Sequence, residues 1–239
     1  MPDIWFLVIA GTAVLLGAIV QSSVGLGLGL VAAPVVAFLD PALIPGAMLI
    51  TTSVLPVFSL MAEWRHIDWR GLAWAIPGRI LGSAAGVWVV ASLAPELLGA
   101  AVGAMVLVAA GLSIRSIRVR VTPASLLTAG AVSGMTGTAT SIGGPPIALL
   151  YQHETGPRVR ATLAGFFLFG VGVSLLLLAV GGQLHEEEVR AGLWLIPFVV
   201  AGFLVGRPLR RAVDAGKMRV ALLSVVTASG LVLLVRSLL

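Results

Sequence analysis

Two short stretches rich in glycine, proline and small polar side chains interrupt a sequence that is otherwise almost continuously apolar. The stronger is Thr136-Gly-Thr-Ala-Thr-Ser-Ile-Gly-Gly-Pro-Pro146, and the weaker is Gln21-Ser-Ser-Val-Gly-Leu-Gly-Leu-Gly-Leu-Val-Ala-Ala-Pro34. Proline lacks a backbone N–H and glycine weakens a helix, so we expect a helix break in each stretch. A helix that restarts after a break presents free N–H groups and the positive end of its dipole, which favour an anion.

The two breaks therefore predict a binding site for a small anion, in which backbone N–H groups are joined by hydroxyl and amide side chains. The alternative is that small residues only allow close helix packing, with each hydroxyl bonded to its own helix. Two breaks in repeat-related positions favour the site. The predicted ligands are Gln21, Ser22, Ser23 and Gly25 in the first stretch and Thr138, Thr140, Ser141, Gly143, Gly144 and Pro145 in the second. Thr51 and Thr52 are further candidates, for which a substrate role and a structural role are equally open.

Arg79 lies well inside an apolar run, in Trp74-Ala-Ile-Pro-Gly-Arg79-Ile-Leu-Gly-Ser. A charge at this depth in a membrane segment is expensive and usually functional. The acidic residues all map near the ends of apolar runs, so a substrate anion is a natural counter-ion for Arg79. The alternative is an arginine that binds backbone carbonyls exposed by Pro77 or extends to the membrane surface.

The composition indicates an integral membrane protein. Of the 239 residues, 59% are hydrophobic and 10% are charged, with a mean hydropathy of +1.08, whereas soluble domains carry about 25% charged residues. We therefore expect one all-α membrane domain over residues 1–239, with the lipid bilayer and a small anion as partners and a homo-oligomer left open. The net charge of +5 lies in the links between apolar runs, so it does not indicate nucleic-acid binding.

No pattern in the sequence indicates an enzyme, a cofactor or a metal site. Cysteine is absent, which excludes thiolate ligands, and neither His-Glu-x-x-His nor an acid pair within an apolar run occurs. Ala131-Val-Ser133-Gly134 falls short of the Gly-x-Ser-Gly pattern of intramembrane proteases. Asp68, in a link between tryptophans, is interpreted as a solvated charge at the membrane surface.

The apolar runs fall into two halves. They cover about 4–20, 24–39, 42–62, 71–93 and 96–114, and then 123–138, 142–152, 161–181, 189–206 and 217–235. A membrane-spanning helix needs roughly 20 residues. The first two runs of each half are shorter and are joined by a break, so each pair is predicted to form a hairpin of broken or re-entrant helices.

The charged links predict an inverted arrangement of the halves, taken as repeat 1 (1–120) and repeat 2 (121–239). Basic links lie inside and the acidic link 185–188 outside, which places both termini outside and gives each half an odd number of segments. The basic residues used are Arg65, Arg70, Arg115, Arg118, Arg120, Arg158, Arg160, Arg207, Arg210, Arg211, Lys217 and Arg219, and Arg236 alone opposes them. Inverted repeats with broken helices are the usual build of secondary transporters.

Residue matches between the halves support the repeat. Gly25 and Pro34 match Gly137 and Pro146 at a shift of 112 residues. The segments 74–86 and 194–206 share Trp, Pro and two glycines at a shift of 120. In the first of these, Gly78, Gly82 and Gly86 form a stripe that predicts close helix packing, with Gly202 and Gly206 as the mirror surface.

The segment Gly137-Thr-Ala-Thr-Ser-Ile-Gly-Gly-Pro-Pro-Ile-Ala-Leu-Leu-Tyr151 resembles the TauE/SafE sulfite exporter family of bacterial multi-pass permeases. Ile50-Thr-Thr-Ser53 and Trp64-Arg-His-Ile-Asp-Trp69 support the resemblance, whereas the first half has spaced glycines in place of the usual glycine triplet. The resemblance implies transport of sulfite or organosulfonates across the inner membrane, commonly as export. We therefore expect a secondary transporter driven by an ion gradient; an anion channel and a membrane scaffold are the alternatives.

Overall fold

The computed structural model describes residues 3–114, 119–209, 227, 230–231 and 233–235, and this part of the chain is helical without strands. The helices are α1 (Ile4–Val24), α2 (Leu28–Leu39), α3 (Gly46–Glu63), α4 (Trp69–Ser92), α5 (Pro95–Ile114), α6 (Pro123–Thr140), α7 (Gly144–Tyr151), α8 (Gly156–Val180) and α9 (Glu186–Leu209). The short 3-10 turns η1 (Pro41–Leu43) and η2 (Trp64–His66) precede and follow α3. The predicted run 217–235 lies largely outside the described residues, as do Arg115, Arg118, Arg210, Arg211, Lys217, Arg219 and Arg236.

Within the described residues, α1, α3, α4, α8 and α9 are long and apolar enough to cross a membrane. The expectation that the first apolar run is too short to span is wrong. The helix continues through the small polar residues up to Val24 and reaches 21 residues. In contrast, α2 has 12 residues and α7 has 8, so each covers only about 18 Å or less of a hydrocarbon core about 30 Å thick.

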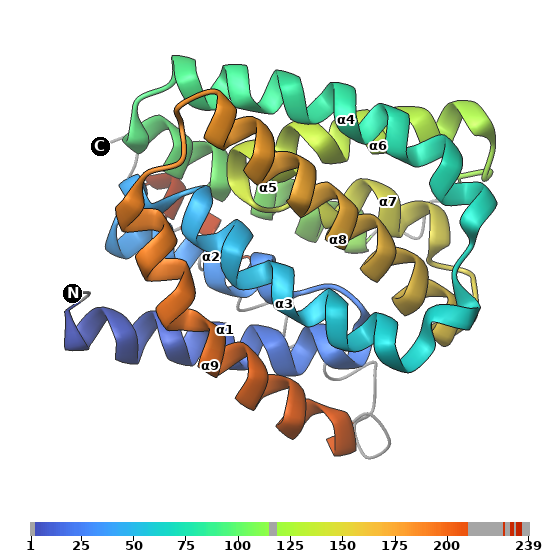
Figure 1. The fold of residues 1–239 in the computed structure, drawn as a ribbon, viewed down its shortest axis with the longest axis horizontal. Coiled ribbons are helices and arrows are strands. Elements are labelled where there is room, and N and C mark those ends of the chain that lie inside the picture. Colours follow the sequence, from blue (N-terminus) through green and yellow to red (C-terminus); the bar gives the residue numbers. More distant parts are fainter. Residues whose placement is uncertain (1–2, 115–118, 210–226, 228–229, 232, 236–239) are drawn as a thin grey trace.

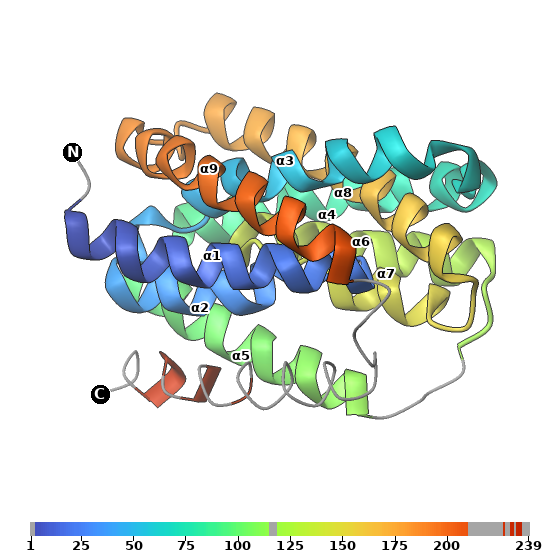
Figure 2. The same ribbon diagram turned by 90° about the horizontal axis from the view of Figure 1, so that it is seen from below.

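Two long helix pairs frame the molecule (Figures 1 and 2). α4 lies along α6, and α9 crosses α1 obliquely, so each pair joins a helix from before residue 120 to one from after it. Between the pairs, α3 contacts both α8 and α9, and α8 contacts α4. The short helices α2 and α7 contact α1 and α6, the helices that precede them.

Glycines set the close approach within the two long pairs. A Cβ on Gly82 would clash with the carbonyl of Ala131 in α6, and one on Gly86 would lie 2.7 Å from the carbonyl oxygen of Met135. On the other pair, a Cβ on Gly202 would lie 2.5 Å from the carbonyl oxygen of Leu15 in α1. The prediction that both glycine stripes serve helix packing is confirmed, because only the missing side chains let the backbones meet.

The two helix breaks correspond to each other at a different residue shift from the one that the sequence match predicts. Gly25 ends α1 as its C-cap, whereas Gly137 lies inside α6, four residues before the C-cap Ser141. Pro34 is inside α2, while Pro146 is in the first turn of α7. The shift of 112 is therefore wrong for this region. The helix ends correspond at a shift of 116, from 25 to 141 and from 27 to 143, because position in the helix and not residue type defines the equivalence.

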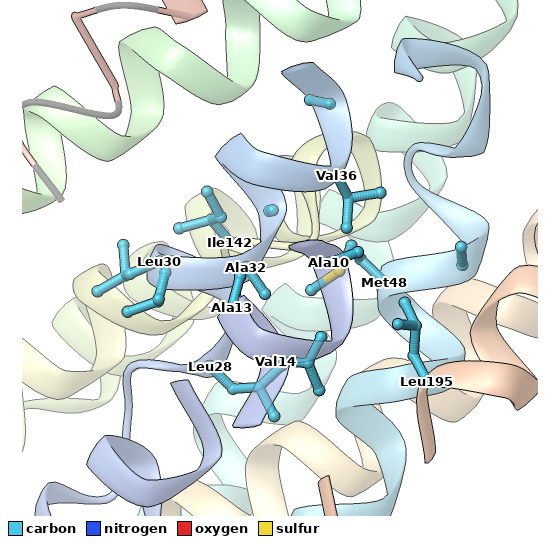
Figure 3. Close-up of a cluster of buried hydrophobic side chains, with 14 of the residues drawn as sticks. Ala10, Ala13, Val14, Leu28, Leu30, Ala32, Val36, Met48, Ile142 and Leu195 are labelled. Carbon is cyan, nitrogen blue, oxygen red and sulfur yellow. The ribbon is translucent and has the colours of Figure 1, made fainter. Parts of the chain in front are cut away.

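The largest buried apolar cluster surrounds the first break (Figure 3). It brings together side chains of α1, α2, α3 and α9 with Ile142 from the second break. Val14 of α1 lies beside Leu28, at the start of α2, and the smaller Ala10 and Ala13 belong to the same cluster. The core therefore fixes both breaks in one place, where they can share a site.

Candidate functional site

Both helix breaks border one cavity of about 60 Å³. A water needs about 10–15 Å³ on this measure, so the cavity has room for about four waters. Residues 26, 27, 29 and 30 line it from the first break and residues 141–145 from the second. The remaining lining residues are Gln21, Leu49, Thr52, Arg79, Gly137, Phe167 and Val171.

At the first break, α1 closes on Gly25 with a φ of 98°, and α2 begins after Gly27 with a φ of 147°. These are conformations that glycine adopts readily. The Gln21 side-chain oxygen accepts a hydrogen bond of 2.9 Å from the N–H of Leu28, the first residue of α2. The N–H groups of Gly29 and Leu30 belong to the first turn, which a helix leaves without internal partners. Both residues line the cavity, so α2 directs its positive end at it.

At the second break, Ser141 takes a left-handed conformation with a φ of 62° and α7 begins at Gly144. The Ser141 hydroxyl donates to the carbonyl oxygen of Pro45, 3.0 Å away. Pro145 and Pro146 carry no N–H, so the start of α7 supplies fewer donors than the sequence pattern predicts. This break offers mainly the N–H of Gly144 and the helix dipole.

Arg79 of α4 also lines the cavity and is only 2% exposed. Its Nη1 donates to the carbonyl and hydroxyl of Ser133, and its Nη2 donates to the Ser174 hydroxyl at 3.2 Å. The Nε group is buried and has no hydrogen-bond partner within the described residues. No carboxylate forms an ion pair with Arg79 in that part of the chain. The carbonyl that binds it comes from α6, not from the turn exposed by Pro77.

Three glycines from different segments make room for the guanidinium. A Cβ would lie 2.6 Å from Nη1 at Gly137 and 2.7 Å from Nη1 at Gly143. At Gly170, a Cβ would clash with Nε and lie 2.8 Å from Cζ. The Phe166 ring lies 5.6 Å from Cζ. The guanidinium is thus closely packed and almost fully buried, where an unpaired ion is costly.

The structure brings only part of the predicted ligand set to the cavity. Seven predicted residues line it, namely Gln21, Thr52, Arg79, Ser141, Gly143, Gly144 and Pro145. The others do not line it. Ser22 and Ser23 donate to the carbonyl of Ile19, Thr51 donates to those of Ala47 and Gly192, and Thr140 donates to that of Thr136. Gly25 packs against Arg160, and Thr138 bonds the Ser174 hydroxyl at 2.7 Å.

Sequence reasoning missed the residues that hold Arg79. Ser133 was considered only as part of a protease motif, and its hydroxyl instead donates to the carbonyl of Gly143. Ser174 and Gly170 lie on α8, from which no ligand was predicted. A hydroxyl well inside the apolar run 161–181, far from either end, is the signal in the sequence for Ser174.

A network of charged residues ties the 63–69 link to the 151–160 link. Asp68 accepts a 3.0 Å hydrogen bond from the Tyr151 hydroxyl and lies 3.4 Å from Arg158, while Arg160 binds Glu63. Burial raises the pKa of Asp68, but the hydrogen bonds from Gly71 N–H and Tyr151, together with Arg158, outweigh it and hold this pKa below its usual range. Asp68 is thus not the solvated charge that its link position predicts, since its side chain is 17% exposed.

Comparison with known proteins agrees with the resemblance seen in the second break. The family model for the sulfite exporter TauE/SafE matches residues 9–233, which is nearly the whole chain. No curated protein and no solved structure gives a match. With its membrane-length apolar helices, the chain is a multi-pass membrane protein and belongs to the TauE/SafE sulfite exporter family.

Proposed function

We propose that this protein is a secondary transporter that exports a small sulfur-containing anion, such as sulfite or an organosulfonate, across the bacterial inner membrane. The observation that carries the proposal is the cavity between the two breaks, bordered by a buried arginine that forms no ion pair with an acidic side chain among the described residues. The links around Arg65–Arg70 and Arg158–Arg160 face the cytoplasm and both termini face outward, as the positive-inside rule indicates.

An anion is the ligand whose charge complements this cavity. A buried charge without a counter-ion is strongly unfavourable, and a bound anion relieves that cost. The free N–H groups at the start of α2 and the dipole of α7 add to the attraction. The hydrogen bonds to Ser133 and Ser174 hold the guanidinium in place, so little reorganisation is needed when the anion binds.

The substrate reaches each side of the membrane by movement of one inverted repeat against the other. Repeated contacts support the internal repeat on which this movement depends. In the α4–α6 pair, Gly82 meets Ala131 and Gly86 meets Met135. In the α9–α1 pair, the equivalent contacts are Gly202 with Leu15 and Gly206 with Ile19. The same two shifts, 120 between α4 and α9 and 116 between α1 and α6, relate both sets.

Sulfite flux into liposomes containing the purified full chain tests the proposal. We expect saturable flux coupled to an ion gradient, and a loss of at least about 30-fold in Arg79→Gln, since removing one partner of a buried charge pair costs about 2–5 kcal/mol. Arg70→Gln is the matched control, because Arg70 is an exposed arginine on the same helix.

The other outcomes separate the alternatives. Voltage-driven, uncoupled current would indicate an anion channel. Absence of flux from well-folded protein would favour a scaffold. Flux that is unchanged in Arg79→Gln would place the site elsewhere.

A further inference from the structure

We propose that the cavity selects its ligand by charge and takes a singly charged oxyanion, so that sulfur(IV) is bound as hydrogen sulfite and not as the sulfite dianion. This inference rests on the proposed function and adds the charge state of the substrate. It follows from the charges, the hydrogen-bond directions and the size of the cavity.

The fixed charge at the cavity is a single positive one. Arg79 is the only charged or titratable side chain among its described lining residues, which come from α1, α2, α3, α4, α6, α7, α8 and the two breaks. The nearby acids Glu63 and Asp68 bind Arg160 and Arg158 and do not line it. A monoanion neutralises Arg79, whereas a dianion leaves a net negative charge. The cost of burying a net charge rises with its square, so the dianion is strongly disfavoured.

The cavity hydroxyls are oriented as acceptors. Ser141 gives its hydrogen to the carbonyl of Pro45, and Thr52 gives its hydrogen to that of Leu49 at 3.2 Å. Both hydroxyl oxygens therefore offer lone pairs to a ligand. An oxyanion that carries an O–H group can donate to such an oxygen, whereas a fully deprotonated oxyanion would meet it lone pair to lone pair.

The free donors are few. Three of the five N–H groups of Arg79 bind Ser133 and Ser174, which leaves the Nε–H and one N–H of Nη2. The first turn of α2 retains the N–H groups of Gly29 and Leu30. Gln21 uses its oxygen to cap Leu28, so its NH₂ group is the part left for a ligand. This set suits one delocalised charge.

The size of the cavity strengthens the charge argument. Room for about four waters accommodates a sulfur atom with three oxygens but no hydration shell around it. The anion must therefore shed its water on binding, and a dianion holds its water far more strongly than a monoanion.

Two ions that share a tetrahedral shape and differ in charge test the proposal. Perchlorate and sulfate compete with sulfite for binding to the purified full chain, measured by titration calorimetry. We expect perchlorate to bind at least about tenfold more tightly than sulfate, which corresponds to about 1.4 kcal/mol. This preference for perchlorate should be lost in Arg79→Gln.

A pH series on sulfite itself gives a second measurement. Hydrogen sulfite loses its proton near neutral pH, so the apparent affinity for total sulfite should fall from mildly acidic to mildly alkaline buffer. Chlorate, a pyramidal monoanion that does not titrate there, should bind equally well throughout.

Sulfate binding as tightly as perchlorate, or sulfite binding that strengthens with rising pH, would overturn the inference. If anion binding in either of these cases were still lost in Arg79→Gln, the proposed transport function would stand. Should neither tetrahedral ion bind, the sulfite and chlorate series decides alone. Sulfite flux that is unchanged in Arg79→Gln would overturn this inference and place the transport site elsewhere, while the transport of sulfite itself would stand.

Discussion

The two helix breaks share a backbone plan and differ in chemistry. Each ends a long helix in a left-handed residue and restarts a short helix three residues later. At the shifts that relate the helices, Gln21 occupies in the first break the position that Gly137 occupies in the second, and Val199 stands where Arg79 does. The bulky amide fills one break and caps α2, whereas the glycine leaves space for a guanidinium. The repeated helix arrangement thus forms an asymmetric site, in which the cation lies at the second break and has no counterpart at the first.

Among substitutions that keep Arg79 itself, the largest effect should come from closing the space around its guanidinium. In Gly170→Ala, the added Cβ clashes with Nε of Arg79, so the guanidinium is displaced from its position at the cavity. Anion flux should therefore fall by at least about tenfold. Gly172→Ala is the control, because no atom lies within 4 Å of its added Cβ. Liposome flux, with elution profiles as a check on folding, compares the two. Equal flux in Gly170→Ala and Gly172→Ala would show that transport does not require this position of the Arg79 guanidinium.

A charge placed in the first break should weaken the site next most. In Gln21→Glu, the carboxylate can still accept from Leu28 N–H but adds a negative charge to the cavity, so anion affinity should fall by about tenfold. Gln21→Ala removes the cap and should instead cost about 1 kcal/mol of stability with a smaller loss of affinity. Calorimetry and thermal unfolding separate the two effects, and stronger binding in Gln21→Glu would contradict the anion site.

Alanine substitutions in the two glycine stripes compare how tightly the α4–α6 and α1–α9 pairs are packed. Gly82→Ala should destabilise the α4–α6 pair by about 1–3 kcal/mol, because its Cβ meets a backbone carbonyl that cannot turn away. Gly202→Ala should have a smaller effect on α1–α9, since its Cβ would lie 2.5 Å from the carbonyl oxygen of Leu15. Gly111→Ala, where the added Cβ meets nothing within 4 Å, is the control. Thermal unfolding in detergent measures these losses of stability. A larger loss in Gly202→Ala than in Gly82→Ala would contradict the prediction.

The smallest effect concerns Asp68 in the link network. Its pKa is lowered in the folded protein, so its contribution to stability is present above the ordinary value of 3.8 and is lost as pH falls through the lower folded value. Asp68→Asn should therefore lower the melting temperature at neutral pH by an amount equivalent to about 1 kcal/mol, and this difference should shrink in strong acid. A difference that persists at all pH values would assign the loss to packing and not to charge.

Much of the candidate site could be predicted from local chemistry. Glycine and proline in an apolar chain locate the breaks wherever the helices lie, and a lone arginine in such a chain must find an internal place. The roles of the hydroxyls could not be predicted in this way. Serine and threonine can bond a carbonyl three or four residues back in the same helix, as Ser22, Ser23 and Thr140 do, so their presence does not show which way they point.

The sequence by itself determined that this is a helical membrane protein with two breaks, a buried cation and glycine-lined helix contacts, because hydropathy and backbone preference are local properties. Only the tertiary structure decided that Ser133 and Ser174 hold Arg79, that Gln21 caps α2, and that Tyr151 and Arg158 converge on Asp68. Each of these contacts joins residues through the rotation and packing of whole helices. That rotation is set by the close fit of side chains across helix pairs, which residue spacing along one helix does not contain.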